Sequence, residues 1–300
     1  MLNILISTLI FLTGLIVGSF LNCIIYRTEL REDMPKGSPH RKAVSFLRGK
    51  SFCPWCGHTL SWDDLIPIFS FLILRGRCKY CQKPISWQYP IVETATGLLF
   101  LLIFNFFTPT PNFGVGASFS ISNFQFLTFL YYLLISCFLI IIFVYDLKHY
   151  IIPDQVIYPA IATAFVYRFF EVLSFNNWDL FRNWKLEIEN LQPLLNPLLS
   201  AILASAFFLL IVLVSRGRWM GVGDIKLAFF MGLFLGWPNI SVALFLAFLI
   251  GAIIGIGLIL IGKKTMKSEV PFGPFLVTGT FLAMFFGCGL ISWYLTLFLV

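Results

Sequence analysis

Charged residues are scarce in this chain. Only 12% of its 300 residues are Asp, Glu, Lys or Arg, whereas 59% are hydrophobic and 18% are aromatic. This balance excludes an ordinary soluble domain. Several apolar runs reach the ~20 residues that a helix needs to cross a bilayer. The composition therefore predicts an all-α polytopic membrane protein with about eight transmembrane helices.

The N-terminus lacks the pattern of a cleaved signal peptide. No positively charged residue precedes Arg27, and no small-residue cleavage site follows the first apolar run. Residues 1–26 are therefore predicted to be a retained first transmembrane helix. Within this helix, Gly14 and Gly18 have the small-xxx-small spacing that permits a close helix contact.

Negative charge is also scarce, and the formal net charge is +7. The positions of the basic residues argue against nucleic acid as the partner. Eleven of the 21 Lys and Arg lie between Arg27 and Lys83, and most of the others flank later apolar runs in loops that alternate onto one side. This is the positive-inside pattern. We therefore predict a multi-pass membrane protein, in contact with lipid, with its basic side in the cytoplasm.

Residues 27–88 form the main long polar segment and contain four of the seven cysteines. Cys53 and Cys56 form one Cys-x-x-Cys pair, and Cys78 and Cys81 form a second. Four thiolates at this spacing can surround one ion tetrahedrally, and Zn²⁺ is the usual occupant. A metal would also supply folding energy that a segment with few aliphatic residues lacks. The segment is predicted to be a cytoplasmic four-cysteine zinc module with a structural ion; two redox pairs or unliganded thiols are the alternatives.

Two carboxylates lie at the ends of apolar runs. Asp146 directly follows one run, and Asp224 opens another within Gly221-Val222-Gly223-Asp224. An acid at membrane depth is a functional-site hypothesis by default. Two Asp carboxyl groups held together can hydrolyse a peptide if one is ionised and the other neutral. We therefore interpret residues 89–300 as a transmembrane aspartyl protease core, in which Gly221 and Gly223 allow close approach to Asp224.

A simpler interpretation keeps these carboxylates structural. Asp146 and Asp224 could cap helices or pair with Lys148 and Lys226, and Asp154 could be only a helix cap. The run from Asp224 to Gly236 is also short, because 13 residues rise only about 20 Å against a core of about 30 Å. Either its helix begins before Asp224 or the bilayer is thin there.

Two other functions are alternatives. An ion-coupled transporter also carries intramembrane acids, but it should show paired internal repeats and acids at mid-span, and the sequence has neither. A membrane anchor for a zinc-ribbon interaction module would explain residues 27–88 but gives no reason for the Gly221–Leu227 motif.

Taken together, the motifs resemble the type IV prepilin peptidase family, the GxGD-type leader peptidase and N-methyltransferase enzymes of type IV pilus and type II secretion systems. The resemblance covers nearly the whole chain. It rests on Gly18–Asn22 with Tyr26-Arg27, the cysteine pairs around Leu65-Ile66-Pro67, Gly76-Arg77-Cys78, Ile85-Ser86, Tyr89-Pro90 with Glu93, Asp146–Asp154, Gly221–Leu227 and Pro271-Phe272-Gly273-Pro274.

The resemblance implies a multifunctional enzyme of the bacterial cytoplasmic (inner) membrane. It would be an aspartic endopeptidase with Asp146 and Asp224 as the catalytic pair, supported by Gly221, Gly223, Lys226 and Asp154. Its substrate would be the helix of a prepilin or pseudopilin, cut at the cytoplasmic membrane face to remove a short basic leader. The new N-terminus would then be methylated with S-adenosylmethionine. This second activity comes from the resemblance alone, because the chain has no Gly-rich cofactor motif, and no residues are assigned to that cofactor.

Overall fold

The computed structural model describes residues 2–33, 51–107, 123–175, 188–218, 220–262 and 270–298. Over these residues the chain is almost entirely helical, and the β-structure consists of two isolated bridges, Phe52 with Thr59 and Arg77 with Pro84. The chain separates into two compact units, Met1–Ile141 and Ile142–Val300. The all-α membrane architecture predicted from the sequence is confirmed.

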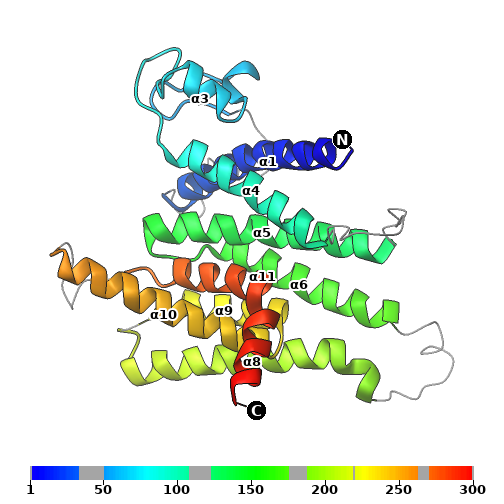
Figure 1. Cartoon of the computed structure of the whole chain (residues 1–300). Coiled ribbons are helices and arrows are strands. Elements are labelled where there is room, and N and C mark those ends of the chain that lie inside the picture. The colour runs from blue at the N-terminus through cyan, green and yellow to red at the C-terminus, as the bar shows by residue number, and fades with distance from the viewer. Residues whose placement is uncertain are drawn as a thin grey trace. The chain divides into compact units, whose positions relative to one another are not determined.

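The first unit is built on a pair of long helices, α1 (Leu2–Asp33) and α4 (Gln88–Phe107), which cross in close contact (Figure 1). Glycine makes this contact possible. A Cβ at Gly14 would lie 2.7 Å from the Cα of Gly97, and a Cβ at Gly18 would lie 2.7 Å from the Cα of Glu93. The close helix contact predicted for Gly14 and Gly18 is therefore confirmed. A short segment with the 3-10 turn η1 (Asp63–Leu65) and helix α3 (Phe69–Ile73) precedes α4.

The second unit begins within helix α5 (Asn123–His149) and surrounds one short helix, α9 (Val222–Leu235). Four other helices complete it, and all of them contact α9. Gly232 of α9 lies directly against the backbone of Ala201, so any side chain at 232 would collide with the neighbouring helix. The surrounding helices are α6 (Asp154–Phe175), α8 (Ile188–Ser215), α10 (Asn239–Leu260) and α11 (Gly273–Phe298).

Seven helices in the described part of the chain are long and apolar enough to cross a membrane. The eighth predicted span is α9, whose 14 residues rise only about 21 Å. Its helix begins two residues before Asp224, so an earlier start accounts for little of the missing length. The seven spans are Ile4–Glu32, Gln88–Phe107, Gln125–His149, Asp154–Leu173, Gln192–Ser215, Asn239–Leu260 and Gly273–Leu297.

Two helices adjoin the predicted metal module. Helix α1 continues through Asp33, seven residues beyond the expected end at residue 26. Helix α4 packs against α1 and belongs to the same compact unit. The part of the predicted module at residues 34–50 lies outside the described residues.

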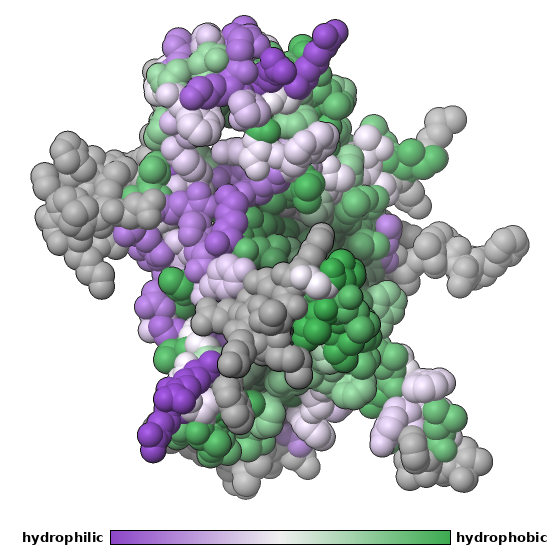
Figure 2. Space-filling view, turned by 90° about the vertical axis from the view of Figure 1, so that its left-hand side faces the viewer, coloured by the Kyte–Doolittle hydropathy of each residue, from purple (hydrophilic) through white to green (hydrophobic). Residues whose placement is uncertain are grey.

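Large apolar side chains lie at the surface of these helices as well as inside them (Figure 2). On α8, Leu203 and Val214 are 68% and 75% exposed, and on α10, Leu260 is 82% exposed. A water-soluble protein would bury such residues, whereas helices in a bilayer present them to lipid. The chain is a multi-pass membrane protein.

Candidate active site and metal centre

Asp146 lies in the last turn of α5 and is buried, with 4% of its surface exposed. Its backbone carbonyl accepts a hydrogen bond from the N–H of Tyr150 at 2.9 Å, which ends the helix. Tyr150 has a left-handed conformation (φ 58°), unusual for a residue with a side chain, and the chain turns there towards α6. Asp146 is therefore held at a sharp corner between two helices.

The carboxyl group of Asp146 lies against the backbone at the start of α11. A Cβ built on Gly273 would be 2.5 Å from Oδ2 of Asp146 and 3.0 Å from its Cγ. Only glycine permits this approach. Within the described part of the chain, Oδ2 is buried and has no hydrogen-bond partner. A buried, unsatisfied carboxylate oxygen is costly, so it marks a place where a proton or a reacting group belongs.

Asp224 lies in the first turn of α9 and is also buried, with 8% of its surface exposed. A carboxylate is favoured at a helix N-terminus, where backbone N–H groups are unpaired. The structure brings Asp146 and Asp224 close enough to interact electrostatically. Two predicted residues far apart in sequence thus share one buried region of the second unit.

The glycines before Asp224 have different surroundings. A Cβ at Gly223 would lie 3.2 Å from the Cβ of Ile152, so this glycine lets the start of α9 pack against the turn that follows Asp146. Gly221 is exposed, and a Cβ there would reach only ordinary contact distance, 4.0 Å from Oδ2 of Asp224. Gly223 therefore has the packing role, and Gly221 leaves the approach to Asp224 open.

Lys226 and Asp154 join the two acidic motifs. The Nζ of Lys226 forms an ion pair with Oδ1 of Asp154 and lies 5.1 Å from the ring centroid of Tyr158. The Asp154 side chain is 59% exposed. The simpler interpretation paired Lys226 with Asp224, but its ion-pair partner is Asp154. Asp154 opens α6 and links it to α9, away from the buried carboxyl pair.

The far end of α9 is closed by a cation that the sequence did not assign to any site. Arg168 of α6 donates from Nε to the carbonyl of Leu233 at 3.1 Å and from a second guanidinium nitrogen to the carbonyl of Phe234. Its third contact is an ion pair with Glu171 at 2.7 Å. The last carbonyls of a helix have no partner within that helix. Arg168 satisfies two of them, so a helix too short to cross the bilayer can still end inside the protein.

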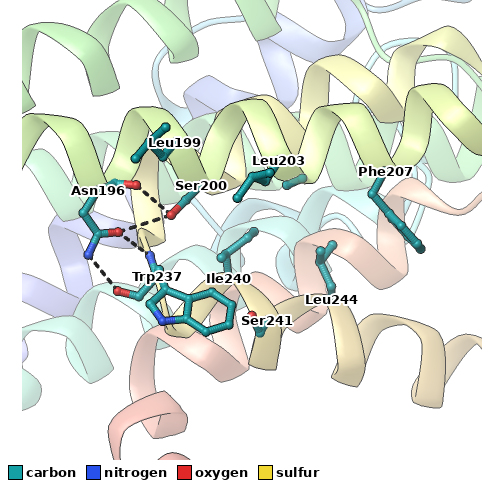
Figure 3. A pocket seen from close by; sticks show the side chains of 10 residues that line it. Asn196, Leu199, Ser200, Leu203, Phe207, Trp237, Ile240, Ser241 and Leu244 are labelled. Carbon is teal, nitrogen blue, oxygen red and sulfur yellow. Dashed lines mark hydrogen bonds between the residues drawn. The ribbon is translucent and has the colours of Figure 1, made fainter.

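A second polar contact fixes the residue that follows this end. Asn196 of α8 accepts a hydrogen bond from the N–H of Trp237 at 2.8 Å and donates to its carbonyl at 3.0 Å (Figure 3). Beyond this pair, a cavity of about 440 Å³ lies between α8 and α10. Apart from Asn196, Ser200 and Ser241 it is lined by apolar side chains, namely Leu199, Leu203, Ala204, Phe207, Trp237, Ile240 and Leu244.

The four predicted metal ligands come together in the first unit. The sulfur atoms of Cys53, Cys56, Cys78 and Cys81 all lie within 4.8 Å of one another, and those of Cys53 and Cys81 are 3.9 Å apart. Tetrahedral coordination with Zn–S bonds of about 2.3 Å places the sulfurs about 3.8 Å apart. The cluster therefore fits a single tetrahedral ion, and its four cysteines could hold a metal.

The two cysteine pairs have matching backbones. In the first, the N–H of Gly57 bonds to the carbonyl of Cys53 at 2.9 Å; in the second, the N–H of Gln82 bonds to that of Cys78 at 3.0 Å. Gly57 and Gln82 are both left-handed, with φ of 68° and 59°. Each pair is a tight knuckle that turns its two sulfurs inwards. This recurrence supports a built metal site rather than a chance grouping of thiols.

The surroundings of Cys53 favour the thiolate that a metal needs. Burial alone would raise the pKa of this thiol, but hydrogen bonds from the backbone of Cys56 and Trp55 and from neighbouring thiols lower its pKa to about 7. Backbone N–H groups stabilise the anion directly. A thiolate is the form of cysteine that coordinates metal.

Sequence reasoning placed Asp146, Asp224 and the cysteines correctly as groups that meet, but it missed two residues. Gly273 was noted only as part of Pro271–Pro274, and nothing in that motif indicates which residue it touches. Arg168 was not assigned any role. A cation within an apolar helix was the available signal, since such a charge needs a buried partner.

Two sequence models of protein families match the chain. The first, described as the bacterial peptidase A24 N-terminal domain, matches residues 12–107, which include the four-cysteine module. The second, described as the type IV leader peptidase family, matches residues 133–256, which include Asp146 and Asp224. No solved structure is a significant match.

Relatives with the same name in different bacteria match almost the full length. The prepilin leader peptidase/N-methyltransferase of Aeromonas hydrophila is 30% identical over 97% of this chain and 94% of its own. The protein of that name from Bacillus subtilis (strain 168) is also 30% identical, over 96% of this chain and 97% of its own. These matches, which cover the buried Asp pair and the cysteine cluster alike, show that the chain belongs to the type IV leader peptidase family.

Proposed function

We propose that this chain is a prepilin leader peptidase that cuts its substrate with Asp146 and Asp224, and that it also methylates the new N-terminus. Family membership supports the overall activity, and it gives no support to the transporter or anchor interpretations. The assignment of the two residues rests on one observation. Two buried carboxyl groups from separate helices interact, and Oδ2 of Asp146 has no hydrogen-bond partner in the described residues.

The chemistry follows from the shared environment of the pair. Two neighbouring carboxyl groups away from water cannot both ionise cheaply, so they share one proton. The ionised group takes a proton from a water molecule, which attacks the scissile carbonyl carbon. The protonated group donates a hydrogen bond to the carbonyl oxygen as negative charge develops on it. Collapse of this tetrahedral species, with a proton passed to the departing nitrogen, releases the leader.

The remaining predicted residues have positioning roles in this proposal. Gly223 brings the start of α9 against Ile152, and the Lys226–Asp154 ion pair joins α9 to α6. Both contacts hold Asp224 relative to the corner that carries Asp146. Gly221 leaves room for the substrate backbone beside the carboxyl pair.

The substrate class and orientation belong to the same proposal. The substrate is the apolar helix of a prepilin or pseudopilin, with its basic leader at the cytoplasmic face of the inner membrane. Arg216 and Arg218 lie on the exposed turn before α9, and Lys148 lies two residues after Asp146. Positive charge at this end supports a cytoplasmic position for the Asp pair. Residues 89–300 then carry the peptidase, whereas residues 27–88 hold the metal module.

We assign Zn²⁺ to the four-cysteine site and give it a structural role. Zn²⁺ prefers four thiolates in tetrahedral geometry, which the sulfur positions fit. With Cys53, Cys56, Cys78 and Cys81 all bound to the ion, no coordination position is left for water or substrate. The metal would therefore cross-link the two knuckles rather than take part in hydrolysis.

S-adenosylmethionine is the methyl donor that the relatives' shared name implies. The cavity between α8 and α10 does not fit it. That lining is almost wholly apolar, and Asn196, its main polar group, is already paired with Trp237. A sulfonium ion with an amino-acid end and an adenosine needs several polar partners. We therefore assign no residue to methyl transfer.

The test is cleavage of a prepilin-type peptide by the purified protein in lipid. Asp146→Asn and Asp224→Asn should each lower the cleavage rate by about 10²–10⁴-fold, because each removes one acid–base group. Asp63→Asn is the matched control, since this aspartate of the four-cysteine module has a 45% exposed side chain and no part in the carboxyl pair or its supporting contacts, and it should cleave within a few-fold of the original chain. Unchanged metal content and thermal unfolding would show that all three variants are folded. Normal cleavage by either Asp146→Asn or Asp224→Asn would refute the assignment.

A further inference from the structure

The apolar surface of α3 is unusual for a segment that lies outside the membrane spans. Helix α3 is Phe-Ser-Phe-Leu-Ile, and only Phe71 is buried. Phe69, Leu72 and Ile73 are 59%, 63% and 79% exposed, and Ile66, in the non-helical segment before α3, is 40% exposed. Phe69, Leu72 and Ile73 lie on one side of this helix, and together with Ile66 we name them the α3 face.

The opposite side of α3, which faces the interior of the module, is already packed. The ring of Phe71 packs against that of Trp87, with centroids 5.0 Å apart, and a Cβ at Gly76 would lie 3.1 Å from it. The four-cysteine cluster holds the rest of the module together. The α3 face is therefore not needed for the module's own core, and its exposure in water would be unfavourable.

The position of α3 relative to a membrane span indicates what covers the α3 face. Oε2 of Glu93 accepts a hydrogen bond from the N–H of Ile68 at 2.8 Å. Glu93 lies five residues inside the span Gln88–Phe107, which corresponds to about 7.5 Å along the helix. Ile68 directly precedes α3. The α3 helix therefore lies beside the first turns of α4 rather than beyond its end (Figure 1).

This attachment is reinforced from α1. The sulfur of Cys23 lies within hydrogen-bond distance of the hydroxyl oxygen of Ser51, at 3.8 Å. The rings of Tyr26 and Phe52 pack edge to face, 5.8 Å apart. The module is thus fixed against two membrane helices and cannot lift its apolar face away from the level of the bilayer surface.

The charge on the module is also compatible with a lipid surface. Two exposed arginines, Arg75 and Arg77, directly follow α3. The segment 51–87 has two acidic residues, Asp63 and Asp64, and both lie within ion-pair distance of Lys79. An amphipathic segment with aromatic and aliphatic residues on one side and cations beside it is typical of a helix that lies in the headgroup region of anionic lipids.

We propose that the α3 face inserts into the surface of the bilayer, so that the four-cysteine module is an interfacial element and not a free soluble domain. Phe69, Leu72, Ile73 and Ile66 enter the boundary between headgroups and acyl chains. Arg75 and Arg77 contact lipid phosphates. This inference does not depend on which reaction the chain catalyses.

The test is photo-crosslinking of the full chain in vesicles of phosphatidylethanolamine and phosphatidylglycerol. A benzophenone amino acid replaces Phe69 or Ile73, and Thr59, an exposed residue of the first cysteine knuckle, is the control position. We expect lipid adducts at positions 69 and 73 by mass spectrometry and none above background at 59. One metal ion per chain in each variant would show that the module is intact.

Other outcomes would overturn the proposal. Adducts between position 69 or 73 and another peptide of the same chain would mean that protein covers the α3 face. A cross-linked dimer would assign it to a second copy. A yield at 69 and 73 no higher than that at 59 would mean that the face is in water.

Discussion

The contact between Gly273 and Asp146 gives the sharpest test of the site. In Gly273→Ala the new methyl group would lie 2.5 Å from Oδ2 of Asp146, whereas real Cβ atoms essentially never approach another heavy atom within 3.0 Å. The carboxyl group or the start of α11 must therefore move by at least 0.5 Å. A displacement of about 1 Å at a catalytic group can cost about 10²-fold in rate.

We therefore expect Gly273→Ala to cleave a prepilin-type peptide about 10- to 100-fold more slowly, which corresponds to about 1.4–2.7 kcal/mol in the barrier. The loss should be in kcat, because the methyl group disturbs a reacting carboxyl group rather than the surface that binds the substrate helix. Steady-state cleavage by the purified protein in lipid measures both constants.

Gly289→Ala is the matched control on the same helix. A Cβ at Gly289 has nothing within 4 Å, so the substitution should leave cleavage unchanged. Alanine is favoured over glycine within a helix, so neither variant should lose helix stability for intrinsic reasons. If Gly273→Ala cleaves as fast as Gly289→Ala, then the position of the Asp146 carboxyl group does not limit the reaction, and its catalytic role is refuted.

Three further predictions concern stability and metal content. Arg168→Met should lower the free energy of unfolding by about 1.5–3 kcal/mol, because two carbonyls at the end of α9 lose a charged donor; an unchanged thermal midpoint in detergent would contradict this. Gly232→Ala should lower the free energy of unfolding by about 1–3 kcal/mol, since its Cβ collides with the α8 backbone. Gly257→Ala should not, because a Cβ there has open space; equal thermal midpoints of the two variants would show that α8 can move aside. Cys53→Ala should lose the bound metal by elemental analysis, while Cys288→Ala keeps it; retention in both would place the metal elsewhere.

The sequence was sufficient for the features that depend on local pattern. Long apolar runs predicted the spans, and the spacing of the cysteine pairs predicted a cluster that the structure brings together. Asp146 and Asp224 were recognisable because a charge at the edge of an apolar run is unfavourable unless it has a function or a partner. In each case the signal lies within a few neighbouring residues, where hydrophobicity and ligand spacing are directly visible.

Features that depend on contacts between distant segments could not be read in this way. Gly273 matters because its missing side chain makes room for Asp146, and no local rule says which residue a glycine will meet. The α3 face was hidden for a similar reason. Residues 66–73 are apolar but too short to suggest a span, and their level in the membrane follows only from the bond between Ile68 and Glu93.

The length of α9 connects the fold to the proposed chemistry. A helix of about 20 residues would reach both surfaces of the bilayer and carry a first-turn carboxylate into the headgroups, where water would surround it. At 14 residues α9 is about 9 Å shorter. A shortened helix normally leaves its last carbonyls unpaired in an apolar medium, which is strongly unfavourable. Arg168 removes that cost at the far end, and the glycine contacts of α9 hold the helix among its neighbours. The near end can then remain below the surface, where Asp224 is buried beside Asp146 and the two carboxyl groups can share a proton.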